Sequence, residues 1–276
     1  MPERRLPAGG ANVFQRIRQR RAEAEARGGK LLDLSIGEPR GAALLSARQA
    51  AAAAVLSDDE AMHTYQYNAS AAVPDFSARF VAAHLKCDLD GLAVDYLPIP
   101  GIKPMLGLLP LACGCAEGEI TVATMSRPGF PIPANWCQYH PKVTHQALPL
   151  HTANRFRFAI GEIVPTADLV MMNYPHNPSG QVASRAWLAE VCRHCSQHDI
   201  RLFNDAAYLA LGHTDESSSL AEAAVDFPEL SWAEAFTAAK LIGNGTDYLR
   251  YAVCADVEAM ADDLRAAFKQ AEVSYD

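Results

Sequence analysis

Four polar side chains in the second half of the chain could share one reaction centre. Lys240 offers an amine, Asp205 a carboxylate, Tyr208 a hydroxyl and Asn177 an amide. An amine can form a Schiff base with a carbonyl carbon, and a carboxylate can hold a ring nitrogen in its protonated form. A hydroxyl and an amide can bond a ring oxygen. Pyridoxal phosphate makes these demands on a protein, so the residues predict a site for that cofactor.

The segments that precede these residues suggest how they converge. A strand predicted over 169–173 runs into Asn177, and another over 201–204 runs into Asp205. In open α/β sheets, ligands bind outside the carboxyl ends of the strands, so both residues are expected at one edge of the sheet. Gly101 precedes a predicted helix, whose free N–H groups and positive end suit a phosphate.

Short apolar segments alternate with helical segments along most of the chain. We expect helices over 11–28, 45–57, 75–87, 102–113, 132–139 and 184–198, and strands over 120–123, 142–148, 169–173 and 201–204. This alternation predicts an α/β fold with a mostly parallel sheet covered by helices on both faces. The sequence contains neither an internal repeat nor a low-complexity linker.

Composition narrows the functional classes. Half of the 276 residues are hydrophobic, which allows a large buried core. The formal net charge of −8 argues against nucleic acid as a partner. The sequence has no apolar run of about 18 residues, so a membrane span is not predicted. The apolar segment that follows the arginines of a secretory signal is also missing. We therefore expect a cytoplasmic protein.

Cysteine usage agrees with a reducing compartment, and the sequence has seven cysteines. Cys192 and Cys195 have the spacing of a zinc half-site, but no second pair of that spacing follows, and the stretch 187–198 has a helical pattern. Cys113 and Cys115 lie at a turn before a strand, where packing explains them. No metal site is predicted.

Six short motifs follow one another along the chain: LSIGEP at 34–39, YLPIPGIK at 96–103, PGFP at 128–131, NYPHNPSG at 173–180, NDAAY at 204–208 and TAAK at 237–240. In this order they resemble fold type I, class I/II pyridoxal phosphate-dependent aminotransferases, in particular the branch of LL-diaminopimelate and N-succinyldiaminopimelate aminotransferases. Each motif is weak alone, whereas their order is specific. The resemblance implies a large cofactor-binding domain of the PLP-dependent transferase type over 45–276. It also implies that 1–44 form an N-terminal arm and part of a small domain.

The resemblance assigns a role to each of the four polar residues. Lys240 would be the Schiff-base lysine and, once the substrate amine has displaced it, the base that moves a proton from the substrate Cα. Asp205 would pair with the ring nitrogen. Tyr208 and Asn177 would bond the ring oxygen.

The same resemblance implies further contacts to the cofactor and substrate. The phosphate would be held by Thr237, the backbone at Ile102 and Lys103, and Arg250. The remaining implied contacts are stacking of Phe130 on the ring, Tyr65 reaching the phosphate of the neighbouring subunit in a homodimer, and Gly37 with Asn177 beside the substrate carboxylate.

Several positions depart from the family pattern. Many relatives place a serine just before the lysine, but this chain has Ala238 and Ala239 there. The position of the usual phosphate arginine is Tyr248, and Arg250 lies two residues further on. Ile102 stands where a Ser or Thr hydroxyl often helps to bind the phosphate. These departures weaken the expected phosphate site.

Length is the largest departure, because relatives continue for roughly another 100 residues. That part carries most of the small domain and the arginine that binds the substrate carboxylate, whereas this chain ends at Asp276. The first hypothesis is an aminotransferase that moves an amino group from an amino acid to a 2-oxo acid, with a diaminopimelate-related substrate. The alternatives are a truncated, non-catalytic homologue with a binding or regulatory role, and another reaction of the same cofactor, such as that of a lyase or decarboxylase.

Overall fold

The computed structural model describes residues 13–32, 41–63, 75–90, 92–99 and 101–240. The chain divides into two compact units, 1–40 and 41–276. The described part of the first unit contains helix α1 (Val13–Ala26), a charged helix with an ion pair of 2.9 Å between Arg21 and Glu25. None of the described helices is both long and apolar enough to cross a membrane.

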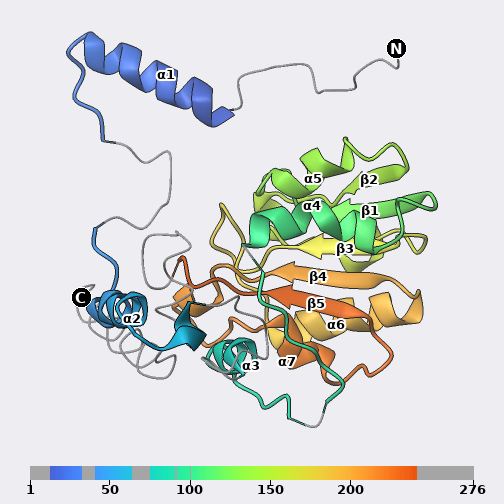
Figure 1. Ribbon diagram of the computed structural model, residues 1–276. Helices are drawn as coiled ribbons and strands as arrows, with labels where there is room; N and C mark the ends of the chain where they lie inside the picture. Colours follow the sequence, from blue (N-terminus) through green and yellow to red (C-terminus); the bar gives the residue numbers. More distant parts are fainter. Residues whose placement is uncertain (1–12, 33–40, 64–74, 91, 100, 241–276) are drawn as a thin grey trace, which may run out of the picture. The chain divides into compact units, whose positions relative to one another are not determined.

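A parallel sheet of five strands organises the second unit (Figure 1). The strands are β1 (Ile120–Thr124), β2 (Val143–Ala147), β3 (Leu169–Met172), β4 (Arg201–Asp205) and β5 (Trp232–Ala235). Their order across the sheet is β2-β1-β3-β4-β5, and every neighbouring pair is parallel. The predicted α/β fold with a mostly parallel sheet is therefore confirmed.

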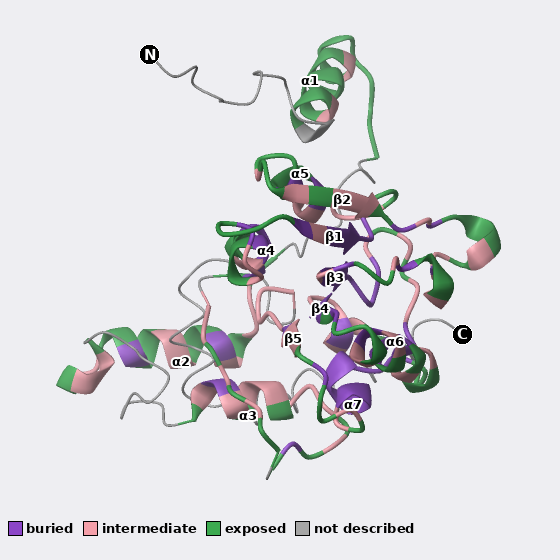
Figure 2. Cartoon of the chain, turned by 90° about the vertical axis from the view of Figure 1, so that its right-hand side faces the viewer, coloured by how far each residue is buried: buried purple, intermediate pink, exposed green. Residues whose placement is uncertain are grey.

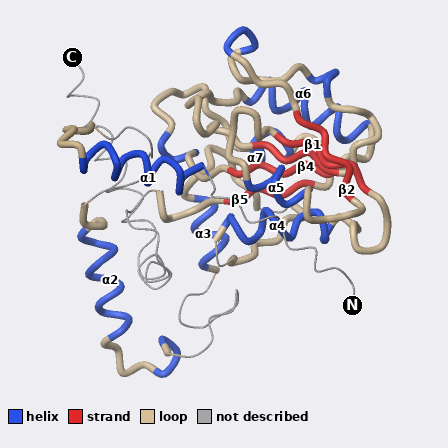
Figure 3. The backbone as a smooth tube through the Cα atoms, turned by 90° about the horizontal axis from the view of Figure 1, so that it is seen from above, coloured by secondary structure: helices blue, strands red, loops and turns tan. Residues whose placement is uncertain are grey.

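Helices cover both faces of this sheet (Figure 3). Helices α4 (Ile102–Ala112) and α5 (Ile132–Cys137) pack on one face, and α6 (Arg185–Gln197) and α7 (Leu220–Ala224) on the other. Beyond β5, α2 (Leu45–Val55) and α3 (Phe76–Ala82) pack around Ala47. Single helical turns are found at Glu60–Met62, Thr152–Asn154, Ile160–Glu162 and Leu209–Leu211.

Successive residues of the central strands point into two separate cores. Val170 and Met172 join the core beneath α6 and α7, whereas Leu169 and Met171 join the core beneath α4 and α5. All four residues of β3 are buried, and Figure 2 shows buried residues in α6 and α7 as well, whereas the edge strand β2 is intermediate to exposed. Burial on both sides explains why β3 has a continuous apolar sequence.

Helix α6 also accounts for the cysteine pair. Cys192 and Cys195 lie three residues apart on its inner face and are fully buried in the core. Burial raises the pKa of both thiols to about 12. The helix predicted over this stretch is confirmed, and the two cysteines serve as packing residues there.

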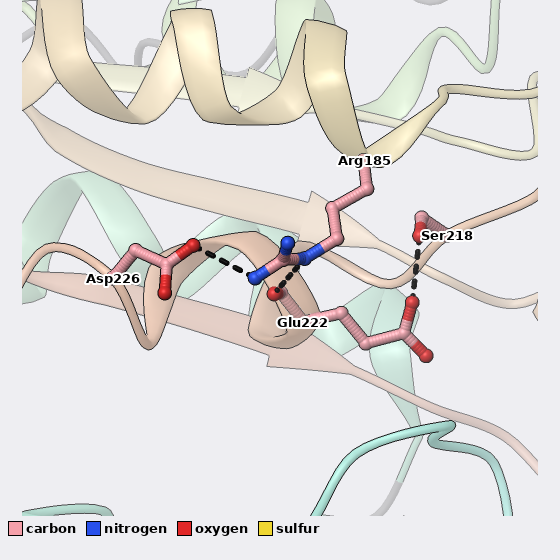
Figure 4. Close-up of polar contacts among 4 residues, drawn as sticks. All are labelled: Arg185, Ser218, Glu222 and Asp226. Atoms are coloured by element: carbon pink, nitrogen blue, oxygen red, sulfur yellow. Dashed lines mark hydrogen bonds and ion pairs between the residues drawn. The ribbon is translucent and has the colours of Figure 1, made fainter.

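Glu222 of α7 joins several segments on this side of the sheet (Figure 4). Its side chain accepts hydrogen bonds from the backbone N–H of Lys86 at 2.8 Å and from the hydroxyl of Ser218 at 2.6 Å. Its backbone carbonyl accepts from Arg185 Nε at 2.8 Å, and Arg185 also pairs with Asp226 at 2.7 Å. The starts of α6 and α7 are thereby fixed to each other.

Lys86 fastens the segment after α3 to a loop that lies far away in sequence. Its ammonium group donates to the backbone carbonyls of Asp215 at 3.2 Å and Ser217 at 3.0 Å. Helix α3 ends at Ala82, earlier than the predicted 87. The shorter helix leaves the following residues free to extend so that Lys86 reaches these carbonyls.

Candidate functional site

Three of the predicted residues lie at or just after the ends of three neighbouring strands. Asn177 lies in the loop after β3, Asp205 is the last residue of β4, and Lys240 follows β5. Because β3, β4 and β5 are parallel and adjacent, their carboxyl ends meet at one edge of the sheet (Figure 1). The structure thus brings these residues to a common place, which the predicted strands before Asn177 and Asp205 indicated for those two residues. Strand β5, which precedes Lys240, was not predicted.

Tyr208 lies between two of these groups. The side-chain amide of Asn177 donates to the Tyr208 hydroxyl at 3.4 Å. The ammonium group of Lys240 lies 5.5 Å from the centre of the Tyr208 ring, within the range of a cation–π contact. Burial and the charge of Asp205 raise the pKa of Tyr208, so its hydroxyl keeps its proton and can donate a hydrogen bond.

Asp205 is a buried carboxylate beside this cluster. Its side chain accepts a hydrogen bond from the backbone N–H of Ala207 at 3.1 Å. Burial raises its pKa to about 6, while the Ala207 N–H and the positive charge of Lys240 act in the opposite direction. In such surroundings, a cationic N–H partner stabilises the charged form of the carboxylate. The protonated ring nitrogen of pyridoxal phosphate is a partner of that kind, so the amine, carboxylate, hydroxyl and amide groups present here fit the cofactor.

A layer of amide side chains lies behind these residues. Asn173 donates to the backbone carbonyl of Asp205 at 2.8 Å, and its side-chain oxygen accepts from the backbone N–H of Asn177 at 2.9 Å. Asn204 and Glu234 extend this layer across β4 and β5. Asn173 and Asn204 lie within the sequence motifs, but neither was assigned a role from the sequence. Nothing in the sequence marked Glu234 as a residue of the site.

The expected phosphate-binding groups lie near the start of α4. Gly101 precedes this helix with a φ of +121°, a conformation that favours glycine. The side chain of Ile102 is buried in the core, so only its backbone faces a ligand, and the Lys103 side chain is exposed. Gly101, Ile102 and Thr237 share the walls of a cavity of about 650 Å³. Two of the predicted phosphate-binding residues, Ile102 and Thr237, thus line one cavity. The Thr237 hydroxyl already accepts a hydrogen bond from the backbone N–H of Ala239 at 3.2 Å.

Phe130 lies in the loop after β1, partly buried against the core beneath α4 and α5. The loop is tightly folded, since a Cβ on Gly129 would lie 2.0 Å from the carbonyl oxygen of Met125. Buried His176 connects this loop to the loop after β3, because its Nε2 lies 3.2 Å from the carbonyl oxygen of Pro128. Stacking of Phe130 on a ring stays a prediction.

Three predicted site residues lie outside the described part of the chain. They are Gly37, Tyr65 and Arg250. Their roles in substrate binding, in contact with a second subunit and in phosphate binding stay predictions.

Comparison with known proteins identifies the family. A family model described as aminotransferase class I and II matches residues 29–243, which is most of the chain. The chain belongs to the class I and II aminotransferases. This family depends on pyridoxal phosphate, in agreement with the cofactor predicted from the residues.

Curated members of the family match part of their length. The LL-diaminopimelate aminotransferase of Desulforudis audaxviator is 27% identical over 203 residues, which covers 71% of this chain and 50% of that protein. Transaminase BacF of Bacillus subtilis is 30% identical over 118 residues, or 40% of this chain and 28% of BacF. The chain spans about half the length of the diaminopimelate aminotransferases that it matches.

Solved aminotransferase structures share the fold. Substrate-bound BacF from Bacillus subtilis has a TM-score of 0.71 at 20% identity, and the alignment covers 95% of this chain and 72% of BacF. The LL-diaminopimelate aminotransferase of Chlamydomonas reinhardtii has a TM-score of 0.71 at 16% identity, covering 95% of this chain and 74% of that one. These likenesses confirm the fold type that the sequence motifs implied.

Proposed function

We propose that this chain binds pyridoxal phosphate covalently through Lys240 and transfers an amino group from an amino acid to a 2-oxo acid. The observation that carries the proposal is the placement of Tyr208. It lies between the Lys240 ammonium group and the Asn177 amide, next to the buried carboxylate of Asp205. Folding alone does not explain why an amine, a carboxylate, a hydroxyl and an amide from three strand ends are gathered here.

When bound, the cofactor supplies a carbonyl carbon that reacts with amines and a ring that takes up the electron pair left by removal of a proton. Lys240 would hold the carbonyl carbon through its Nζ, and the same Nζ, once free, would serve as the base for the proton on the substrate Cα. Its position over the Tyr208 ring keeps the amine within the site. Asp205 would attract the protonated ring nitrogen, and Tyr208 and Asn177 would donate to the ring oxygen.

The roles proposed for the outer parts of the site come from the resemblance to the family. The first N–H groups of α4 and the region of Thr237 would bind the phosphate, with Arg250 as the cationic partner. Gly37 and Asn177 would lie beside the substrate carboxylate. We also propose a homodimer, in which Tyr65 of one subunit reaches the phosphate of the other.

LL-diaminopimelate is the first amino donor to test. The support is that several matching relatives, at 25–27% identity over about 70% of this chain, are named LL-diaminopimelate aminotransferases. BacF, which matches a shorter part, is named only as a transaminase, so a wider set of amino acids belongs in the same test.

A non-catalytic binding protein is the second candidate. Two observations favour it. Ile102 is buried in the core, and Ala238 packs against the cluster of α2 and α3, so neither position supplies the hydroxyl that many relatives place near the phosphate. A weak phosphate site would fit a protein that has kept the fold without the reaction.

The absorbance spectrum of the purified protein with added pyridoxal phosphate tests the proposal. We expect an absorption band that borohydride reduction attaches to the chain, and we expect Lys240→Ala to lose it. Lys142→Ala is the matched control, because the Lys142 ammonium group binds the backbone carbonyls of Ala116 and Glu117 at 3.0 and 3.1 Å, away from the site. The same spectrum for wild type and Lys240→Ala would exclude covalent attachment at Lys240. Attachment without amino transfer to any 2-oxo acid would favour the binding protein or another reaction of the cofactor.

A further inference from the structure

We propose that Asn173, Asn204 and Glu234 are positioning residues that fix Asp205 relative to Asn177. The proposal rests on the cofactor site described above, and it concerns three side chains that bond backbone groups and one another. Asn204 is fully buried, Asn173 is 7% exposed and Glu234 is partly buried.

Asn204 and Asn173 form reciprocal bridges between the ends of β3 and β4. The side chain of Asn204 bonds both backbone groups of Tyr174, accepting from its N–H at 2.9 Å and donating to its carbonyl at 3.1 Å. Asn173, the residue before Tyr174, donates in turn to the carbonyl of Asp205, the residue after Asn204, at 2.8 Å. Each strand thus uses a side-chain amide to hold the backbone of the other.

These bridges begin where the regular strand pairing ends. The last paired residues of β3 and β4 are Met172 and Asn204, and beyond them the chains separate into the loops that carry Asn177 and Tyr208. The amides replace the missing backbone hydrogen bonds at that point. The Asn173 oxygen also accepts from the backbone N–H of Asn177, so one side chain bonds both Asp205 and Asn177.

Glu234 holds the Asn204 amide in one orientation. Its carboxylate accepts from Asn204 Nδ2 at 2.7 Å, from the backbone N–H groups of Leu220 and Ala221 at 2.9 and 3.0 Å, and from the Ser219 hydroxyl. An acceptor at this place requires the NH₂ end of Asn204 to face it, which leaves the oxygen end for the N–H of Tyr174. The chain of contacts therefore runs from the start of α7 through β5 and β4 to the loop after β3.

The test compares Asn204→Ala and Glu234→Gln with a control at the other end of β3. Asp168→Ala is that control, because Asp168 accepts a hydrogen bond from the N–H of Thr121 at 2.7 Å, just before β3 begins. Its loss should lower the melting temperature without reaching the site. Glu234→Gln keeps the size of the side chain and decides the test if Asn204→Ala fails to fold.

Two measurements follow from the proposal. In the protein without cofactor, hydrogen exchange at the amides of Tyr174 and Asn177 should become roughly fivefold faster in Asn204→Ala, and less so in Glu234→Gln, since a hydrogen bond of about 1 kcal/mol is lost. With pyridoxal phosphate bound, the midpoint of the pH titration of its absorbance should shift in both variants, because Asp205 and the ring-oxygen donors are displaced relative to each other. Asp168→Ala should change neither measurement.

Exchange rates and a titration midpoint equal to those of Asp168→Ala would overturn the proposal. Failure of the wild type to bind the cofactor is a separate result, because it would overturn the proposed function while the exchange rates still decide whether the amide bridges hold the two loops together.

Discussion

The side-chain nitrogen of Asn177 lies 3.4 Å from the hydroxyl oxygen of Tyr208, although the two residues follow different strands of the sheet. The contact places two donors side by side, where both can bond one oxygen atom of a ligand. The Lys240 ammonium group, 5.5 Å from the centre of the Tyr208 ring, completes a set of groups from three strand ends.

Removal of the Tyr208 hydroxyl should weaken cofactor binding without abolishing covalent attachment. In Tyr208→Phe the ring that faces Lys240 remains, but one donor is lost. We expect the dissociation constant of pyridoxal phosphate to rise about 2- to 12-fold, since a single hydrogen bond contributes about 0.5–1.5 kcal/mol. Titration followed by absorbance measures it. Tyr139→Phe alters an exposed ring and should behave as wild type, and equal affinity of all three proteins would contradict the role of the hydroxyl.

Substitution of Asp205 by Asn should stabilise the protein without cofactor at neutral pH. Burial raises the pKa of Asp205 from 3.8 to about 6, so its charged form is disfavoured in the folded state. The stability of the wild type therefore decreases as the pH rises from about 4 to 6, and the penalty persists above pH 6. Asp205→Asn should gain up to roughly 3 kcal/mol at pH 7, since one pKa unit corresponds to about 1.4 kcal/mol, and should gain nothing below pH 4.

The difference in stability is measured by denaturant unfolding of the wild type and Asp205→Asn at several pH values, without cofactor. Cofactor affinity should change in the opposite direction, because the variant has no charge to offer the ring nitrogen. A variant that is less stable than wild type at pH 7 would show that the carboxylate has a structural role instead.

His176 should make the fold sensitive to mild acid. Burial lowers its pKa, and the contact with the Pro128 carbonyl only partly opposes this. The unfolded chain takes up a proton below about pH 6.5 that the folded state resists, so stability is lost as the pH falls. His176→Gln should reduce this slope between pH 7 and 5 without removing it, because burial also lowers the pKa of His84, His145 and His194. Free energies of unfolding across this range test the prediction, and an unchanged slope would contradict it.

A methyl group at Gly129 should destabilise the protein and displace Phe130. The added Cβ would lie 2.0 Å from the Met125 carbonyl oxygen, so the backbone of the loop must move. We expect Gly129→Ala to lower the free energy of unfolding by about 1–3 kcal/mol or more. Gly161→Ala is the matched control, because a Cβ there meets no atom within 4 Å. Equal stability of the two variants in urea would argue against the tight turn.

Periodicity and motif order predicted the central elements well. The buried strands, such as Leu169–Met172, and the amphipathic helix Arg185–Gln197 agree with the predicted ranges to within one or two residues. The meeting of Asn177 and Asp205 followed from parallel strands that end at one edge, whereas Lys240 was placed with them only by the order of the motifs, because the strand before it was not predicted. These features depend on local apolar patterns, which a single sequence displays.

Other elements depend on contacts that a single sequence does not display. Strand β5 is only four residues long, has no apolar alternation and contains Glu234. Helix α7 has five residues, too few for a periodic pattern. Glu234 suits its position because it binds the first N–H groups of α7, so each of these two elements depends on the other.

The anchoring of Lys86 has a consequence for any attempt to obtain a smaller version of this protein. A fragment that begins at Gly101 would contain all five strands and the four polar residues of the site. It would also leave the buried carboxylate of Glu222 without the N–H of Lys86, and the carbonyls of Asp215 and Ser217 without its ammonium group. The segment that precedes the sheet is thus a structural requirement of the loop after β4, and a fragment that keeps these contacts has to begin before Lys86.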